Sequence, residues 1–437
     1  MTKFHKAAPL NRILSALLAL ALFVSVPSAG AIEFTTVRGE SEGPHAVLIV
    51  PAPVHDQSIG MAKQLATLPL DRGKLTIIET NGDPKIGQVG ETLARAGASG
   101  DNIPNWVWVH NGAVSESGDN PVVRIAAGNS DALGAAIEEA LETKVTVAQD
   151  TSSRTARFAS QGTMVFEYPN RTPVSRQQRF TREFTVLLLR ETGMIPADTD
   201  FEWDGLASVA KHLIALYDAD GIGGAGPRNL ERIAAAEIDD VGIYRVCGED
   251  IREGALGPAA TSIFPGGSGG GIGNGLQEQG REMLREYITA GGGYIGVCAG
   301  AYFAGSGLGH YLHAIDLRHS QPWRRGGGMI EIELTPEGKA LFGNDATVLK
   351  TRFNNGPVFL PEDQDGGGDP NFVTLATFKT PSTDNSGVVR EEMVGQSAIG
   401  SLTYGDGRML IISPHPESHV EHHAFVARAI KWTMGLD

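Results

Sequence analysis

The second half of the chain alternates short apolar runs with amphipathic segments. Four apolar runs end in glycine or polar turns and predict strands, whereas two segments with apolar residues every three or four positions predict helices. The strands fall within residues 212–224, 240–251, 260–271 and 293–298, and the helices within 226–237 and 276–292. This alternation predicts a parallel sheet covered on both faces, with any ligand at the carboxyl ends of the strands.

The first half of the chain has the same rhythm. Strands are expected within 45–55, 73–82, 105–112, 122–128 and 163–169, with helices over 58–70 and 176–194. Polar, turn-forming residues at 197–206 indicate a linker, and the glycine-rich stretches 264–275 and 361–371 indicate loops. The pattern therefore predicts an α/β protein with two domains, over residues 32–196 and 207–437.

Residues 1–31 have the pattern of a signal peptide. Basic residues precede an apolar run from Ile13 to Val26, and Ala29-Gly30-Ala31 forms an A-x-A cleavage site. The run is short for a membrane-spanning helix, although an uncleaved anchor is the alternative. We therefore expect an exported protein, periplasmic or extracellular, with no stable membrane insertion after cleavage.

The composition is that of a globular protein, with 437 residues, 41% hydrophobic and 20% charged. The formal net charge of −15 becomes −18 when the basic residues of 1–31 are removed. Such a chain repels nucleic acid and anionic membranes, so a small-molecule or peptide substrate is the expected partner. Two cysteines, Cys247 and Cys298, provide no disulfide framework, although one bridge between them is an alternative that would block Cys298 as a nucleophile.

Cys298 lies at the end of a predicted strand, between two glycines. Gly296 and Gly300 give the pattern G-x-C-x-G, which is typical of a nucleophile elbow, where a strand turns sharply into a helix. A cysteine that merely packs in the core is the alternative. The glycines favour the nucleophile.

A histidine and a carboxylate follow another buried-type strand near the end of the chain. His415 and Glu417 have the spacing at which an acid can orient an imidazole that accepts a thiol proton. With Cys298 they predict a Cys-His-Glu triad. The alternatives are a solvated loop or a metal cluster with His419, His422 and His423.

These motifs resemble class I glutamine amidotransferase-like domains over about residues 207–437. Four motifs occur in the order of that family: "PGG" at 265–267, the G-x-C-x-G motif, "FNNGPVF" and "HPE". The sequence around Cys298 is similar to the biotin-protein ligase N-terminal branch. The resemblance implies a flavodoxin-like α/β sandwich in which Cys298, His415 and Glu417 are catalytic. It also implies an oxyanion hole formed by the N–H groups of Gly267 and Ala299.

The chain contains neither a biotin-ligase catalytic domain nor an ammonia-accepting synthetase domain, so hydrolysis of an amide or acylamino-acid bond is expected rather than ammonia transfer. The Cys298 site would require no cofactor. A degenerate binding domain that has kept its elbow is the alternative, and the substrate and oligomeric state stay open.

The first half of the chain resembles a zinc carboxypeptidase-like family, that of succinylglutamate desuccinylase and aspartoacylase, over about residues 44–195. The resemblance implies zinc ligands at His55 and His110 and a general base at Glu167. Ser58 stands where the family has a glutamate ligand, so zinc would bind weakly unless Asp56 or another carboxylate replaces it. A zinc-dependent deacylase or peptidase and a scaffold without chemistry therefore both stay open for this domain.

Overall fold

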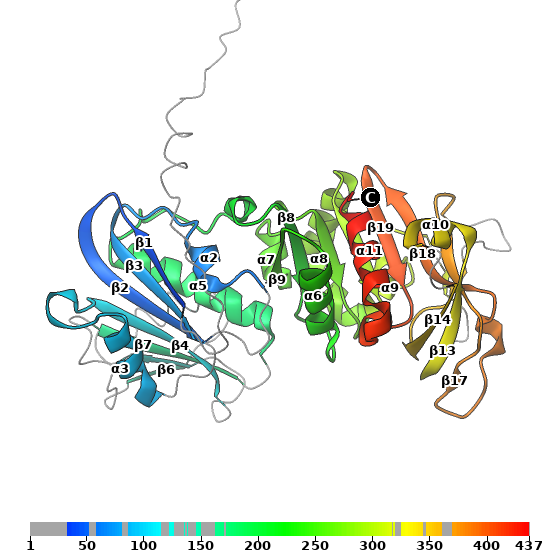
Figure 1. The fold of residues 1–437 in the computed structure, drawn as a ribbon, viewed down its shortest axis with the longest axis horizontal. Coiled ribbons are helices and arrows are strands. Elements are labelled where there is room, and N and C mark those ends of the chain that lie inside the picture. Colours follow the sequence, from blue (N-terminus) through cyan, green and yellow to red (C-terminus); the bar gives the residue numbers. More distant parts are fainter. Residues whose placement is uncertain are drawn as a thin grey trace, which may run out of the picture.

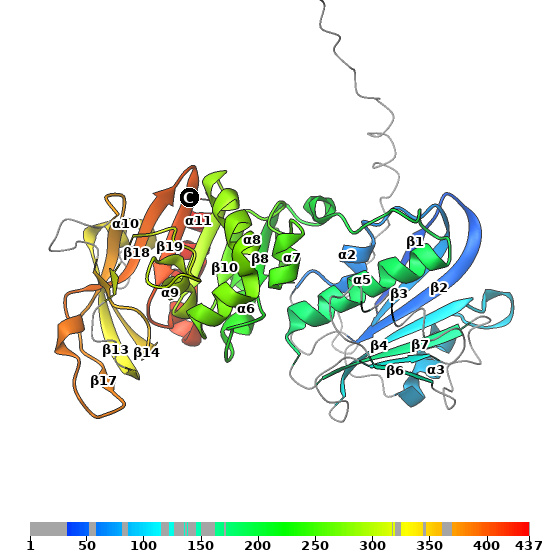
Figure 2. The same ribbon diagram turned by 180° about the vertical axis from the view of Figure 1, so that it is seen from behind.

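The computed structural model arranges the chain around two β-sheets that lie beside each other along the long axis of the molecule (Figure 1). Helices pack against both sheets, as the view from behind also shows (Figure 2). The structure describes residues 33–51, 58–80, 86–114, 122–125, 135, 138, 146–149, 162–169, 172–316, 318–319, 325–343, 347–360 and 369–436.

The first sheet has seven strands and is of mixed direction. Its members are β1 (Glu33–Arg38), β2 (Ser41–Pro51), β3 (Arg72–Thr80), β4 (Trp106–Val114), β5 (Val122–Ile125), β6 (Thr146–Gln149) and β7 (Gly162–Pro169). They follow the order β1-β3-β2-β4-β7-β5-β6, with β2, β3, β4 and β7 parallel. The five predicted strands are confirmed.

Helices cover both faces of this sheet. The helices are α2 (Met61–Leu65), α3 (Ile86–Arg95) and α5 (Val174–Glu191), with the short 3₁₀ turn η1 (Gly100–Asn102). α5 and α2 bury their apolar residues on one face, against Trp108 and Phe166, and α3 places Leu93 on the other. α2 is shorter than the predicted helix 58–70, because Ser58 and Ile59 pair with the backbone of Ile243 before it and Pro69 disfavours a longer helix after it.

Five parallel strands form one side of the second sheet, including one of its edges. They are β8 (His212–Tyr217), β9 (Val241–Val246), β10 (Thr261–Phe264), β11 (Gly293–Val297) and β19 (Gly407–Ile412). Their order is β19-β11-β10-β8-β9, and the sheet ends at β9. The parallel sheet predicted for the second half is confirmed in this part.

An antiparallel extension continues the second sheet beyond β19. It consists of β18 (Ser397–Tyr404), β16 (Val373–Phe378), β13 (Gly326–Leu334) and β14 (Val348–Asn354), with the short strands β12 (Arg318–His319), β15 (Phe359–Leu360) and β17 (Thr383–Asp384). Each long strand is antiparallel to its neighbour, and β14 is the outermost. The predicted all-parallel sheet did not include this extension, and the second sheet is therefore mixed as a whole.

The second sheet also carries helices on both faces. They are α6 (Gly226–Glu237), α7 (Gly248–Arg252), α8 (Gly269–Thr289), α9 (Ala299–Ala304), α10 (Pro336–Phe342) and α11 (His423–Thr433). The 3₁₀ turns are η3 (Trp203–Ser208), η4 (Glu391–Met393), η5 (Pro416–Ser418) and η6 (Val420–His422). The loop expected over 264–275 is wrong from Gly269 onward, because the Ser268 hydroxyl caps a helix there. Gln277, at the start of the predicted helix 276–292, is not helical and interrupts α8.

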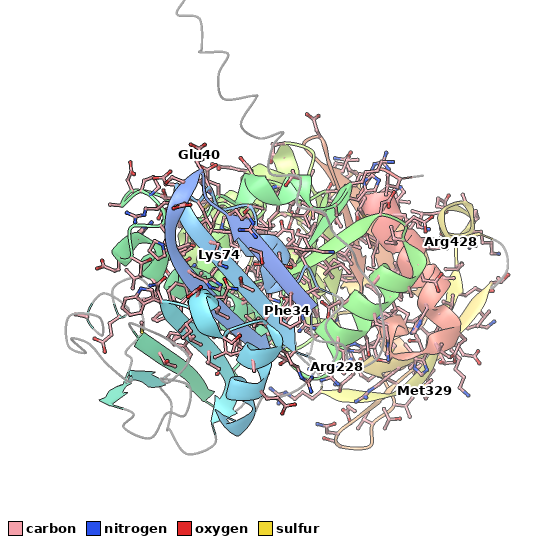
Figure 3. The ribbon with its side chains drawn as sticks, turned by 60° about the vertical axis from the view of Figure 1, so that its left-hand side comes forward. Phe34, Glu40, Lys74, Arg228, Met329 and Arg428 are labelled. Atoms are coloured by element: carbon pink, nitrogen blue, oxygen red, sulfur yellow. The ribbon has the colours of Figure 1, made fainter. Side chains whose placement is uncertain are left out.

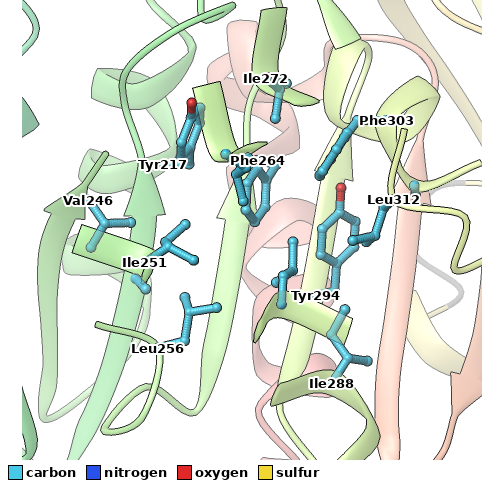
Figure 4. Close-up of a cluster of buried hydrophobic side chains, with 14 of the residues drawn as sticks. Tyr217, Val246, Ile251, Leu256, Phe264, Ile272, Ile288, Tyr294, Phe303 and Leu312 are labelled. Carbon is cyan, nitrogen blue, oxygen red and sulfur yellow. The ribbon is translucent and has the colours of Figure 1, made fainter. Parts of the chain in front are cut away.

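A buried aromatic cluster fills one face of the second sheet (Figure 4). The ring of Phe264 stacks on Tyr217 and Tyr294 at centroid distances of 5.1 Å and 5.3 Å and also contacts Phe303. Such ring pairs contribute beyond the apolar area that they bury. Because Phe264 ends β10 and Tyr294 lies in β11, this packing fixes the two strands whose carboxyl ends carry the candidate site.

The two parts of the chain contact each other through backbone pairing. Ser58 forms a parallel bridge with Ile243 of β9, and the Ile59 N–H donates to the Ile243 carbonyl at 2.5 Å. The Ser58 hydroxyl donates to the Glu231 carboxylate on α6. Residues before α2 therefore cover the outer edge of β9.

A buried ionic cluster joins the same two parts. Arg182 of α5 donates to Asp250 of α7 at 2.6 Å, and both side chains are at most 1% exposed. The Arg182 guanidinium also lies 4.4 Å from the centre of the Trp203 ring. Trp203 and Leu206 are buried in the core, so the segment predicted as a linker packs against the second sheet rather than only connecting the domains.

Within the described residues, no helix is both long and apolar enough to cross a membrane. Some apolar side chains of both sheets are exposed to solvent, as Phe34 on β1 and Met329 on β13 show (Figure 3).

Candidate active site

Cys298 occupies a sharp turn between β11 and α9. Its backbone angles, φ of 51° and ψ of −97°, lie in a region that residues with a side chain rarely adopt. A Cβ on Gly296 would lie 2.5 Å from the Gly300 carbonyl oxygen, and a Cβ on Gly300 would lie 2.0 Å from that of Phe264. Both glycines are therefore required for the turn, which has the strand–turn–helix form of a nucleophile elbow.

His415 and Glu417 follow β19, the parallel neighbour of β11. Nδ1 of His415 lies 2.7 Å from Oε1 of Glu417, and the glutamate is 2% exposed. A carboxylate at this position holds the imidazole proton on Nδ1 and leaves Nε2 to accept another. Among the described residues Nε2 has no hydrogen-bond partner.

The surroundings of His415 change its affinity for protons. Burial alone would lower the pKa of His415, but the neighbouring Cys298 and Glu417 together raise it to about 10. A Cβ on Gly266 would contact both His415 and Cys298, so the ring lies beside the cysteine, and its raised pKa makes it a strong acceptor for the thiol proton.

The Cys298 thiol itself donates elsewhere in this geometry. Its sulfur lies 3.5 Å from the carbonyl oxygen of Asn354, at the end of β14. The thiol therefore donates to this carbonyl, and Nε2 of His415 has no hydrogen-bond partner among the described residues. Loose contacts of this kind between catalytic groups are common before substrate binds.

Two backbone N–H groups beside Cys298 are available as donors. Gly267 forms an antiparallel bridge with Ile222, and this bridge uses the N–H groups of Gly223 and Ser268 but not that of Gly267. Ala299 is the first residue of α9, where an N–H has no partner within the helix. In the described chain, neither group donates a backbone hydrogen bond. Both N–H groups are therefore available to another acceptor.

Gly266 contributes to the site and was not singled out by the sequence. A Cβ at this position would lie 2.8 Å from Cε1 of His415 and 3.6 Å from Cβ of Cys298. Only a residue without a side chain can lie here between the histidine and the cysteine. The motif "PGG" was the available signal, but its spacing did not distinguish the role of Gly266 from that of Gly267.

The two cysteines are not bonded to each other. Cys247 is fully buried, and its sulfur lies 3.1 Å from Oδ2 of Asp250, whose carboxylate also accepts the Cys247 N–H. Burial first, and then the charges of Asp250 and Glu249, raise the pKa of the Cys247 thiol well above its ordinary value. Cys247 therefore caps α7. The alternative of a disulfide between Cys247 and Cys298 is not what the structure contains.

The other C-terminal histidines make contacts with β14. His419 accepts from the Arg352 N–H at 3.2 Å, and His422 Nε2 lies 2.9 Å from the Lys350 carbonyl oxygen. No group of three or more histidine, cysteine or acidic side chains in the described ranges could hold a metal ion. The metal-cluster alternative for these histidines gains no support.

The zinc residues expected in the first domain fall largely where the structure describes no side chain. His55 lies outside the described residues, and so does Asp56. The backbones of His110 in β4 and Glu167 in β7 lie at adjacent register positions, because His110 pairs with Phe166 and Asn111 with Glu167. Ser58 is directed to the Glu231 carboxylate of the second domain. Ser58, which occupies the position where the resemblance requires a zinc ligand, therefore forms a hydrogen bond with the second domain.

Comparison with solved structures finds distant similarity. PurLQS from Thermotoga maritima is 12% identical, with a TM-score of 0.36, over 51% of this chain and 97% of that one. A cytoplasmic protein from Salmonella typhimurium is 10% identical, with a TM-score of 0.35, over 51% and 98%. A protein described as ThuA-like from Bacteroides uniformis is 11% identical, with a TM-score of 0.36, over 51% and 91%.

Comparison with curated protein sequences finds no match. Comparison with family models identifies one segment, which begins before β10 and ends after α9. This segment contains Gly267, Cys298 and Ala299, whereas His415 and Glu417 lie beyond it. Residues 255–313 match the family described as the N-terminal domain of biotin-protein ligase.

Proposed function

We propose that the protein hydrolyses an amide or acylamino-acid bond with Cys298 as nucleophile, His415 as general base and Glu417 as its orienting acid. The observation that carries this proposal is the juxtaposition of an elbow cysteine with a histidine held by a buried glutamate at 2.7 Å. A buried cysteine that only packs needs neither the strained turn nor the oriented imidazole.

The reaction follows from the positions of these groups. Nε2 of His415 takes the thiol proton, and the sulfur forms a bond to the carbonyl carbon while the C=O π electrons move to the oxygen. The N–H groups of Gly267 and Ala299 stabilise this oxyanion. When the carbonyl re-forms, the C–N bond breaks, His415 returns the proton to the departing nitrogen, and a thioester remains on Cys298.

Water completes the cycle. His415 removes a proton from a water molecule, the resulting hydroxide attacks the thioester, and the carboxylic acid leaves as the proton returns to sulfur. The pattern of residues 1–31 supports export, so we propose a substrate of the periplasm or the cell exterior, such as an amino-acid, peptide or cell-wall amide.

The test uses the full mature chain and a panel of amino-acid amides and small peptides, with released ammonia or amine as the measurement. Cys298→Ala and His415→Ala should abolish release, whereas Cys247→Ser, which keeps a capping side chain on α7, should retain it. Release that persists in Cys298→Ala would overturn the proposal.

A further inference from the structure

The outer edge of β14 contacts the candidate site and the histidines that follow it. β14 pairs with β13 on its inner side only, so its other edge would present unpaired backbone groups. Three alternate carbonyl groups on this outer edge each accept one hydrogen bond. The pairs are Lys350 with His422 Nε2 at 2.9 Å, Arg352 with the His415 N–H at 2.8 Å, and Asn354 with the Cys298 thiol at 3.5 Å.

The strand period explains why these three groups act together. Backbone groups of residues two apart point to the same edge of a strand, so positions 350, 352 and 354 form one row. The Arg352 N–H belongs to the same row and donates to His419 Nε2 at 3.2 Å. One strand edge therefore binds the base His415 and the nucleophile Cys298, although they follow two different strands.

We infer that His419 and His422 are positioning residues that hold the edge of β14 in register with His415 and Cys298. The inference rests on the proposed function for its catalytic meaning, but the geometry that it concerns does not depend on hydrolysis. His415 is anchored by a backbone bond to Arg352, and the two histidines fix Arg352 and Lys350 from the same side. Without them, the outer edge of β14 would lose two of the hydrogen bonds that fix its position relative to the base and the thiol.

The two imidazoles act through opposite hydrogen-bonding roles. His422 donates to a carbonyl and is 9% exposed, which holds one ring nitrogen as a donor. His419 accepts an N–H on Nε2, so the proton of its neutral ring lies on Nδ1, which is 3.8 Å from Oε1 of Glu421. A glutamine can replace either role, because its amide group has both a donor and an acceptor.

The experiment measures the rate at which iodoacetamide alkylates Cys298 in the full mature chain at neutral pH, followed by peptide mass spectrometry. His419→Phe and His422→Phe should each slow the reaction about fivefold to tenfold, because each variant loses the one hydrogen bond by which the histidine holds β14 beside the base. Loss of the thiol contact to Asn354 opposes this change only weakly, because sulfur is a weak donor. His419→Gln and His422→Gln should restore most of the rate.

His423→Phe is the matched control, since the described structure gives His423 no hydrogen bond to β14, and it should leave the rate unchanged. Alkylation at the wild-type rate in folded Phe variants would overturn the inference. Gln variants as slow as the Phe variants would overturn it as well. If His422→Phe does not fold, the comparison of His419→Phe with His419→Gln, at a partly exposed position, tests the inference alone.

Alkylation requires no substrate, so the two proposals fail separately. If the variants change alkylation as expected while no amide is hydrolysed, the positioning role stands and the proposed function fails. If hydrolysis occurs with an unchanged kcat in both Phe variants, the proposed function stands and the positioning role fails.

Discussion

Gly266 lies against the imidazole of His415, with space for a hydrogen atom but not for a methyl group. Because an added Cβ would lie 2.8 Å from Cε1 of His415, Gly266→Ala must displace the ring or the loop. We expect the variant to lose about tenfold or more in kcat for amide hydrolysis, since small displacements of a catalytic base are costly. Steady-state kinetics are the measurement.

The matched control for this variant is Gly223→Ala in the neighbouring loop. A Cβ there would meet only Cα of Gly267, at an ordinary 3.7 Å. Its activity should be close to that of the wild type. Equal losses in the two variants would show that the loops tolerate no side chain in general, and that His415 is not the group displaced.

The two thiols should differ in reactivity. Cys298 lies beside His415, whereas Cys247 is buried against Asp250, with its thiol pKa raised. We expect iodoacetamide to modify Cys298 at mildly acidic pH, below the free-thiol pKa of about 8.5, and much faster than Cys247. His415→Ala should slow the alkylation of Cys298 near neutral pH. Equal rates for both cysteines in the folded protein would argue against an activated nucleophile.

Stability should depend on pH through His415. Its folded-state pKa is raised from 6.5 to about 10, so the folded state binds the proton more tightly than the unfolded state. The resulting stabilisation is fully present below pH 6.5 and is lost as the pH rises to about 10. Urea unfolding of the wild type and of His415→Gln at several pH values measures it. The difference between the two free energies of unfolding should shrink over this range, and a constant difference would contradict the assignment.

Replacing Ser58 by glutamate tests the first domain. The missing zinc ligand predicts that Ser58→Glu strengthens zinc binding, whereas the structure directs position 58 to the Glu231 carboxylate. We expect Ser58→Glu to lower the midpoint of thermal unfolding, because the new carboxylate would face that of Glu231 and the two negative charges would repel each other. Ser58→Ala, which removes only the hydroxyl, should lower it less. Tighter zinc binding by Ser58→Glu in calorimetry, with undiminished stability, would restore the metal-site hypothesis.

The ionic cluster between the two parts should be important for stability. Arg182→Ala leaves the buried Asp250 with a poorer set of partners, and removing one member of a buried pair costs about 3–5 kcal/mol. Arg95→Ala breaks an exposed pair with Glu91 and should cost less than about 1 kcal/mol. Denaturant unfolding compares the two. Similar small losses of unfolding free energy in the two variants would show that other partners of Asp250 compensate for the missing arginine.

The elements nearest to Cys298 could be predicted from the sequence because their signals are local. The helix 226–237 coincides with α6, and the glycines around Cys298 correctly indicated a sharp strand-to-helix turn. The mixed α/β character of the fold follows from the same alternation of apolar runs and amphipathic segments. Spacing and periodicity report such features because the residues involved are close together in the chain.

The contacts that assemble the site were not predictable in this way. His422 reaches Lys350 across 72 positions, and Cys298 reaches Asn354 across 56. Trp203 lies in a polar, turn-rich segment, and its burial depends on packing against Tyr244 and Arg182. Ser58 was compared with a family ligand, but its hydroxyl bonds to a residue 173 positions later. No local pattern encodes these partners.

The backbone pairing of Ser58 and Ile59 with β9 has a consequence for self-association. A terminal strand with open N–H and C=O groups is a template for another molecule's strand, and a chain is most exposed to such pairing while it folds. In this chain the cover for β9 is supplied by residues that precede it by almost two hundred positions. Refolding therefore remains vulnerable to intermolecular strand exchange until the N-terminal sheet has formed, and a molecule clipped between the two sheets would tend to pair with a second copy of itself.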